Sequence, residues 1–207
     1  MKNLLWLLAS VIICLSLFSC KSEIEKERNR QREIELDSAK IKAQNSEILV
    51  DTIFLGFRFG MTEREVMTHL KKLIKQKKIY LDDFGDCRYE LHGEYNLKYT
   101  LGFIPEYYKG KLFKMTFPIE HFSGSDECYV MVFGIFKKAN PNYSWYIVKN
   151  ILGDDVYTSI SHNLIVTFEK FAGESAMIYE NAPISLLKEK EEKIENEKKI
   201  RNTLSDF

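Results

Sequence analysis

The alternation of apolar and polar positions divides the sequence into four zones. Residues 1–19 contain a continuous apolar run, and residues 20–47 are polar, with mixed charges and few apolar side chains. Residues 48–182 carry apolar side chains at the spacings of strands and amphipathic helices, which predicts a folded domain. Residues 183–207 are again mostly charged. The pattern therefore predicts one domain between a charged tether and a charged terminal helix.

The clearest local signal within the domain is the start of a helix at Thr62. Thr62 and Glu65 form a capping box, in which each side chain accepts a hydrogen bond from the backbone amide of the other residue. Met61 and Val66 have the spacing of the accompanying hydrophobic staple. We expect the helix to continue to about Gln76, because apolar residues recur on one face. These residues are Val66, Leu70, Leu73 and Ile74.

Strands are predicted on both sides of this helix. Residues 53–57 are apolar and strand-like, and apolar residues alternate with polar or small ones over 95–103. A further apolar run at 111–117 follows the tyrosines at 107–108. The dipeptide 109–110, Lys-Gly, has the composition of a tight turn. The sequence therefore predicts a hairpin in this region.

A three-stranded meander is predicted near the end of the domain. The segments 156–161, 164–171 and 175–179 are strand-like. The short connections at 162–163 and 172–174 contain residues that favour tight turns. Three neighbouring antiparallel strands are therefore expected.

The segment 125–138 fits two structures. Ser125-Asp126-Glu127 is typical of a helix start and Lys137-Lys138 of a helix end, whereas 129–133 also fits a strand. We predict a helix, because four apolar residues fall on one helical face. They are Tyr129, Val132, Phe133 and Phe136. With the other elements, this defines an α+β fold in which helices pack on a mainly antiparallel sheet.

The two charged flanks have different expected structures. Residues 20–47 are predicted to be a tether with at most transient helix, which as a coil would span roughly 30 Å. Residues 183–207 are predicted to be a helix supported by i,i+4 ion pairs. Either this helix is solvated beyond a start that contacts the domain, or it docks a partner. The pairs are Glu189–Lys193, Glu195–Lys199 and Glu197–Arg201.

Composition and motifs remove several functional classes. Lys and Arg number 30, as do Asp and Glu, so nothing electrostatic favours nucleic acid. We find no phosphate loop, zinc helix or nucleophile elbow, and we predict no catalytic residue, cofactor or metal. Residues 82–86 are rich in Asp but lack the alternating ligands of a calcium loop, which favours a polar turn. The four histidines are far apart in the sequence, at His69, His92, His121 and His162.

Two cysteines lie within the predicted domain, Cys87 and Cys128. In an oxidising compartment they are candidates for a disulfide. It would close a loop of about 41 residues and stabilise the domain by roughly 4 kcal/mol. Two buried thiols are the alternative, and the sequence leaves both open.

The first twenty residues resemble a bacterial lipoprotein signal. Lys2 precedes an apolar run of about 15 residues, shorter than the roughly 20 that span a bilayer. The run ends in Leu17-Phe18-Ser19-Cys20, where the resemblance implies cleavage before Cys20 and lipidation of its thiol and amino terminus. An uncleaved anchor or an ordinary secretory signal are the alternatives. Two or three acyl chains hold a protein firmly, so we expect an envelope protein, in the outer membrane, on either its periplasmic or its surface face.

Two further resemblances concern the domain. The segment 59–66, Phe-Gly-Met-Thr-Glu-Arg-Glu-Val, resembles the helix start of BamE/SmpA-like lipoproteins, which are small α+β outer-membrane proteins. The Gly-x-Pro that usually follows the helix in that family is missing. The chain is also similar to uncharacterised envelope lipoproteins of Bacteroidetes in its signal, tether and aromatic strands. These resemblances imply a cellular location and a fold, but they identify no functional residue.

These observations predict a lipid-anchored, non-catalytic binding or accessory module, with a protein partner at the C-terminal helix or the sheet face. An envelope hydrolase is an alternative that needs a pocket gathering several polar groups. An inhibitor of a foreign protein is another, and it would show an exposed aromatic patch on the sheet. The polar groups that the hydrolase pocket would bring together are Asp86, His92, Glu120, His121 and Cys128.

Overall fold

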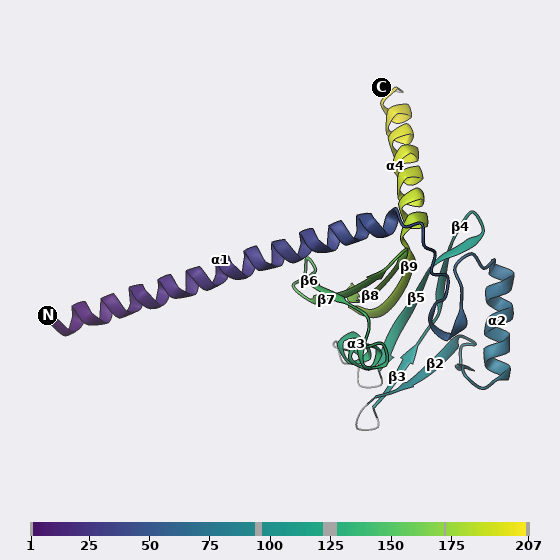
Figure 1. The fold of residues 1–207 in the computed structure, drawn as a ribbon, viewed down its shortest axis with the longest axis horizontal. Coiled ribbons are helices and arrows are strands. Elements are labelled where there is room, and N and C mark those ends of the chain that lie inside the picture. The colour runs from purple at the N-terminus through teal and green to yellow at the C-terminus, as the bar shows by residue number, and fades with distance from the viewer. Residues whose placement is uncertain (1, 94–96, 122–127, 172, 206–207) are drawn as a thin grey trace. The chain divides into compact units, whose positions relative to one another are not determined.

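A computed structural model describes the backbone of residues 2–93, 97–121, 128–171 and 173–205 (Figure 1). Side chains are described for residues 23–93, 97–121, 128–170 and 173–201. The chain forms two compact units, residues 1–38 and residues 39–207. All residues of the two hydrophobic core clusters belong to the second unit, which therefore contains the folded domain.

The N-terminal helix α1 extends over Lys2–Gln44. The expectation of a mainly unstructured tether is therefore wrong, because residues 21–44 are helical. The segment contains neither Gly nor Pro and is rich in Glu, Lys, Arg and Gln, which have high helix propensity. Among the described residues, no helix has both the length and the apolar character required to span a bilayer.

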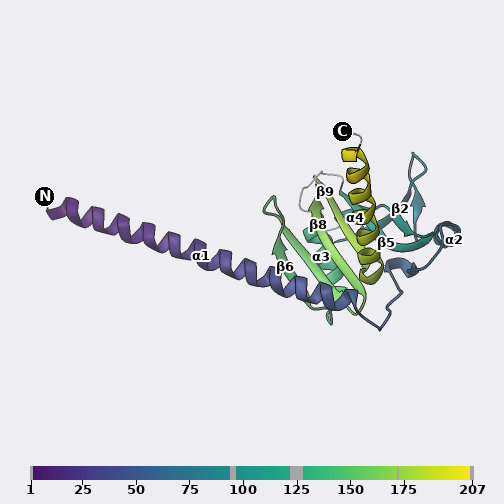
Figure 2. The ribbon, with the colours of Figure 1, turned by 90° about the horizontal axis from the view of Figure 1, so that it is seen from above.

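The domain is built on a nine-stranded sheet in which all the pairings of named strands are antiparallel. The strand order is β1-β2-β3-β5-β9-β8-β7-β6, and β4 also pairs with β5. Figure 2 labels β2, β5, β9, β8 and β6, which follow one another in this order across the sheet. The α+β prediction is confirmed. The strands are β1 (Tyr80–Leu81), β2 (Cys87–His92), β3 (Lys98–Leu101), β4 (Ile104–Tyr108), β5 (Lys111–His121), β6 (Trp145–Lys149), β7 (Asp155–Ser161), β8 (Leu164–Phe171) and β9 (Glu174–Asn181).

Among the described residues, three α-helices follow α1 in the chain. Helix α2 (Glu63–Lys75) begins at the predicted capping box, and α3 (Cys128–Ala139) packs on β5, β8 and β9. Helix α4 (Ala182–Ser205) follows β9 directly and contacts β5 and β9 with its first part. The helix predicted at 125–138 is confirmed from Cys128 onward, and its first residues, 125–127, lie outside the described residues.

The main core lies between α3 and one face of the sheet. Phe117, Met177 and Phe168 stand opposite one another across β5, β9 and β8, each at most 1% exposed. Phe133 of α3 stacks on Tyr157 of β7 at 4.0 Å between ring centroids. Burial of so many aromatic rings is the main driving force for folding.

The predicted hairpin and meander are confirmed. Lys109 and Gly110 have positive φ angles of 49° and 76°, as the turn between β4 and β5 requires. A fourth strand, β6, pairs with β7 next to the meander β7-β8-β9, and the sequence interpretation missed this strand. Of the strand expected at 95–103, residues 98–101 form β3, residues 97, 102 and 103 do not belong to a strand, and residues 95–96 lie outside the described residues.

The strand expected at 53–57 is wrong. This segment contains a short 3-10 helix, η1 (Phe54–Gly56), in which Leu55 and Gly56 both have positive φ. The chain reverses there, because Thr52 pairs with Arg58 in an antiparallel bridge. The bend keeps the apolar side chains in the core but ends the strand.

Candidate functional site

A polar pocket of about 580 Å³ lies where β2, β3 and β5 meet the start of β9. It brings together residues from distant parts of the chain, including four of the five groups proposed for a hydrolase. His92 does not line it. The pocket is lined by Asp86, Cys87, Arg88, Gly102, Phe103, Ile104, Pro118, Ile119, Glu120, His121, Cys128, Gly173, Glu174 and Ser175.

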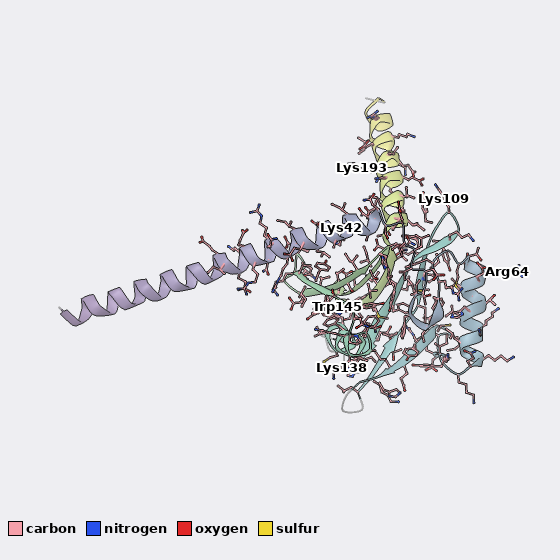
Figure 3. All side chains as sticks on the ribbon, in the orientation of Figure 1. Lys42, Arg64, Lys109, Lys138, Trp145 and Lys193 are labelled. Atoms are coloured by element: carbon pink, nitrogen blue, oxygen red, sulfur yellow. The ribbon has the colours of Figure 1, made fainter. Side chains whose placement is uncertain are left out.

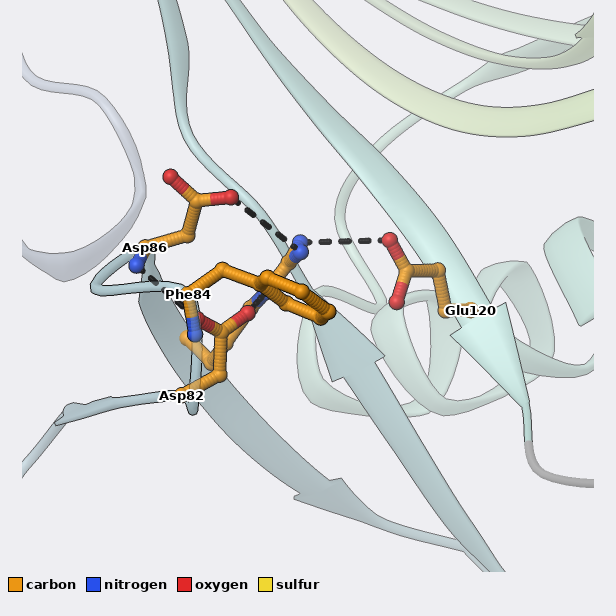
Figure 4. Close-up of polar contacts among 5 residues, drawn as sticks. Asp82, Phe84, Asp86 and Glu120 are labelled. Atoms are coloured by element: carbon orange, nitrogen blue, oxygen red, sulfur yellow. Dashed lines mark hydrogen bonds and ion pairs between the residues drawn. The ribbon is translucent and has the colours of Figure 1, made fainter.

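Arg88 is the central cation of this pocket. The carboxylates that contact it, Asp82, Asp86 and Glu120, are labelled in Figure 4. Its Nε donates to Asp82 Oδ2 at 2.8 Å, and its Nη1 donates to Glu120 Oε1 at 3.1 Å. The Nη2 atom lies 3.7 Å from Asp86 Oδ2. The hydrogen bond to Asp82 raises the pKa of Arg88, and the same bond lowers the pKa of Asp82. The guanidinium group of Arg88 is thus paired with carboxylates of the protein itself.

The loop 82–86 is a polar turn, as the sequence predicts. Asp82 Oδ1 accepts hydrogen bonds from the amides of Phe84 and Asp86, at 3.0 and 2.9 Å. Gly85 has a φ of 85°, which closes the turn. Both Asp82 oxygens are therefore engaged, and no group of three His, Cys, Asp or Glu residues suited to a metal occurs among the described residues.

Cys87 and Cys128 line the same pocket, and the structure contains them as thiols. Burial, followed by the charges of Asp86 and Asp82, raises the pKa of Cys87. Its thiol therefore stays protonated near neutral pH, which disfavours a nucleophilic role. Cys128 is buried at the start of α3.

The histidines remain dispersed, and His121 alone among the four lines the polar pocket. His69 donates through Nε2 to the carbonyl of Leu55 at 2.9 Å and therefore supports the bend at η1. His92 is exposed at the end of β2, and His162 occupies the turn between β7 and β8 with a φ of 55°.

Charged contacts join the first part of helix α4 to the β4–β5 hairpin. Figure 3 labels Lys109 of the hairpin and Lys193 of α4. Lys109 at the hairpin tip lies 2.8 Å from Glu191, and Lys188 lies 3.6 Å from Glu106. The Lys188 ammonium also lies over the Phe113 ring at 5.0 Å. The hydrogen bond to Glu191 raises the pKa of Lys109.

Beyond these contacts, the described part of α4 is exposed to solvent from Glu189 to Arg201. Ile194 and Ile200 are 53% and 59% exposed on this part, and Leu187 near the base is 52% exposed. Of the predicted intrahelical pairs, Glu195–Lys199 is present at 2.8 Å. The sequence predicted a helix that contacts the domain at its start, and this geometry confirms that contact.

Comparisons with protein-family models, with curated proteins and with solved structures found no match to this chain. Sequence reasoning missed the ion pair between Arg88, which lines the pocket, and Asp82, which does not. The Asp-rich loop 82–86 indicated Asp82 in the sequence, whereas Arg88 lies in β2, a strand that no sequence pattern predicted. The side chain of Cys20 lies outside the described residues.

Proposed function

We propose that the protein is a lipoprotein of the bacterial cell envelope, held in the outer membrane by a lipid on Cys20, and that its domain is a non-catalytic binding or accessory module. The signal-like sequence supports the anchor. The binding role rests on α4, whose base is attached to the sheet while its outer part offers exposed apolar side chains. A helix that is attached at its base and exposed beyond it leaves these side chains available to a partner protein.

The anchor is tested by membrane fractionation of cells that express the wild type or Cys20→Ala. We expect the wild type in the membrane fraction with an acylated N-terminal peptide in mass spectrometry, and the variant without that modification. A wild-type protein without acyl groups would contradict the proposal. Protease added to whole cells then distinguishes the surface face, where the domain is digested, from the periplasmic face.

The binding role is tested by crosslinking in native membranes, followed by affinity purification. We expect one partner protein to be recovered repeatedly with the wild type and to be lost with the double variant Ile194→Ser/Ile200→Ser. It should persist in Lys193→Ser/Lys198→Ser, which alters the same part of α4 without removing apolar side chains. Equal recovery with both double variants would exclude this surface of α4.

The polar pocket supports a second candidate, an envelope hydrolase. Its specific observation is that Asp86 shares one cavity with Glu120, His121 and Cys128, although Asp86 is far from the other three in sequence. Ester hydrolysis that is lost in His121→Gln and kept in His92→Gln would favour this candidate.

The inhibitor hypothesis has less support, because the exposed aromatic side chains among the described residues are Tyr80 and Phe84, outside the central strands.

A further inference from the structure

A second cavity lies on the core face of the sheet, away from the polar pocket. We call it the apolar slot; its volume is about 310 Å³. Leu101 of β3 and Met177 of β9 contribute its sheet side, and the segment around Ile53 and Phe54 contributes another wall. Leu101, Met177 and Ile53 are at most 3% exposed, so the slot reaches into the core.

Helix α3 forms a long wall of the slot. Val132, Ile135, Phe136 and Ala139 all line it, at positions that recur on one helical face. Seven residues of helix rise by roughly 10 Å, so the slot is elongated along α3. An elongated shape fits a linear chain better than a wide ring system.

The chemistry of the lining selects an uncharged occupant. No charged residue is found among the described residues that line the slot, and the polar members include Thr52, Asn140 and Tyr143. A buried charge without a partner is strongly unfavourable. Asn140 and Tyr143 follow the last turn of α3, so a hydrogen-bonding head group would lie at that end of the slot.

Water in a slot with this lining finds few hydrogen-bond partners, so its displacement by an apolar chain is favourable. An apolar cavity of about 150 Å³ takes up one benzene molecule, so this slot has room for roughly a dozen heavy atoms. Ligand sites of proteins are typically apolar cavities of this size class with a few polar groups. Volume, shape and lining therefore agree on one class of ligand.

We propose that the apolar slot binds an uncharged linear hydrocarbon chain of about ten carbons with one hydrogen-bonding head group, such as the end of an acyl chain. The site is distinct from the α4 surface and does not depend on it. The chain belongs either to a free molecule or to a membrane lipid, and both present the same chemistry to the slot.

Binding is measured with the chain from Lys21 onward, which contains every residue of the core clusters. Decan-1-ol is titrated against it by calorimetry in the absence of detergent. We expect saturable binding of one molecule per chain. Decanoate and naphthalene serve as the charged and the ring-shaped comparisons, and both should bind more weakly. Absence of decan-1-ol binding, or tighter binding of either comparison, would overturn the proposal.

The site is located with two variants of α3. Ala139→Phe places a ring at the slot, at an exposed position where the fold tolerates it. The affinity for decan-1-ol should fall about tenfold or more, since the ring displaces several methylene groups. Met131→Phe adds the same ring at an exposed position that does not line the slot and should leave the affinity unchanged. Equal affinities in both variants would place binding elsewhere.

The source of the chain is identified with the full-length protein. Mass spectrometry of apolar molecules that co-purify from native membranes should detect a free alcohol, ester or amide in one case and a membrane lipid in the other. Either finding supports the slot if it is depleted in Ala139→Phe and kept in Met131→Phe. A co-purifying molecule retained equally by both variants would contradict the assignment.

Discussion

Single side chains hold the edges of this domain in place, and Asn163 is the clearest example. It is fully buried in the turn between β7 and β8. Its Oδ1 accepts from the amide of Val50, and its Nδ2 donates to the carbonyl of Val50 at 3.1 Å. Its own carbonyl accepts from Ala182 at the start of α4, at 2.8 Å. One residue thus joins the chain entering the domain to the chain leaving it.

Asn163→Ala should lower the free energy of unfolding by about 1–3 kcal/mol, because two hydrogen bonds are lost and the half-buried amide and carbonyl of Val50 lose their side-chain partner. Urea unfolding measures this loss. His162→Asn is the control, since Asn tolerates the positive φ of the exposed neighbouring position and should change stability by less than about 0.5 kcal/mol. Equal effects of both substitutions would show that the turn, and not the side-chain clamp, is responsible.

The capping box couples stability to pH. Hydrogen bonds from the Thr62 amide and hydroxyl lower the pKa of Glu65 below its ordinary value of 4.5. A group with a lowered folded pKa stabilises the protein above its unfolded pKa, and this stabilisation is lost as the pH falls through the folded pKa. Acid should therefore weaken the start of α2.

Glu65→Gln tests this coupling, because Gln keeps an acceptor but loses the charge. The stability gap between wild type and variant should be present near neutral pH and should shrink once the pH falls well below about 4. Glu63→Gln, in the same helical turn but outside the capping box, should show a smaller gap at neutral pH. A gap for Glu65→Gln that does not change with pH would rule out the charge as its cause.

Among the elements, α3 and the β4–β5 hairpin contain glycines with opposite roles. Gly134 lies within α3, where an added methyl group would meet nothing within 4 Å. Gly134→Ala should therefore stabilise the domain by roughly 0.5–1 kcal/mol, since Ala loses less backbone entropy in a helix. Gly110→Ala should destabilise it by about 1 kcal/mol, because the turn needs a positive φ. Thermal unfolding of the two variants should shift in opposite directions; shifts of the same sign would contradict this account.

Elements with a local cause could be predicted from the sequence. The capping box at Thr62, the Lys109-Gly110 turn and the helix after Cys128 depend on neighbours within a few residues. The bend at Leu55 could not be predicted, because His69, which lies 14 residues further along the chain, stabilises it through the hydrogen bond to the Leu55 carbonyl. Strand β2 was missed because its side chains are half-buried without clear alternation.

The candidate sites needed the long-range topology as well. Arg88 meets Glu120 only because β3 lies between β2 and β5 in the sheet. The apolar slot likewise needs α3, β3, β9 and the bend at Ile53 to meet. The sequence identified Asp86, Glu120, His121 and Cys128 as chemically interesting, but no spacing along the chain could place them in one pocket.

At the scale of the whole domain, α4 consists of two parts with different surroundings. Its first part covers the sheet, where Ser185 is buried and Lys188 lies over Phe113, which is 2% exposed. Its outer part, from Lys193 onward, is exposed in all its described residues. The boundary between the two lies near Glu192, one turn after Lys188. Removing the entire helix would therefore change the stability of the domain together with any partner binding, and the two effects could not be separated.

Two truncations separate these effects. A chain that stops after Glu192 should unfold at the same urea concentration as the wild type, because the exposed part adds little buried surface, yet it should lose the crosslinked partner. A chain that stops after Pro183 should lose more than about 2 kcal/mol of stability, since Phe113 becomes exposed to water. If the shorter truncation retains the partner, the outer part of α4 is not the binding surface. If both truncations unfold alike, the first part of α4 does not stabilise the sheet.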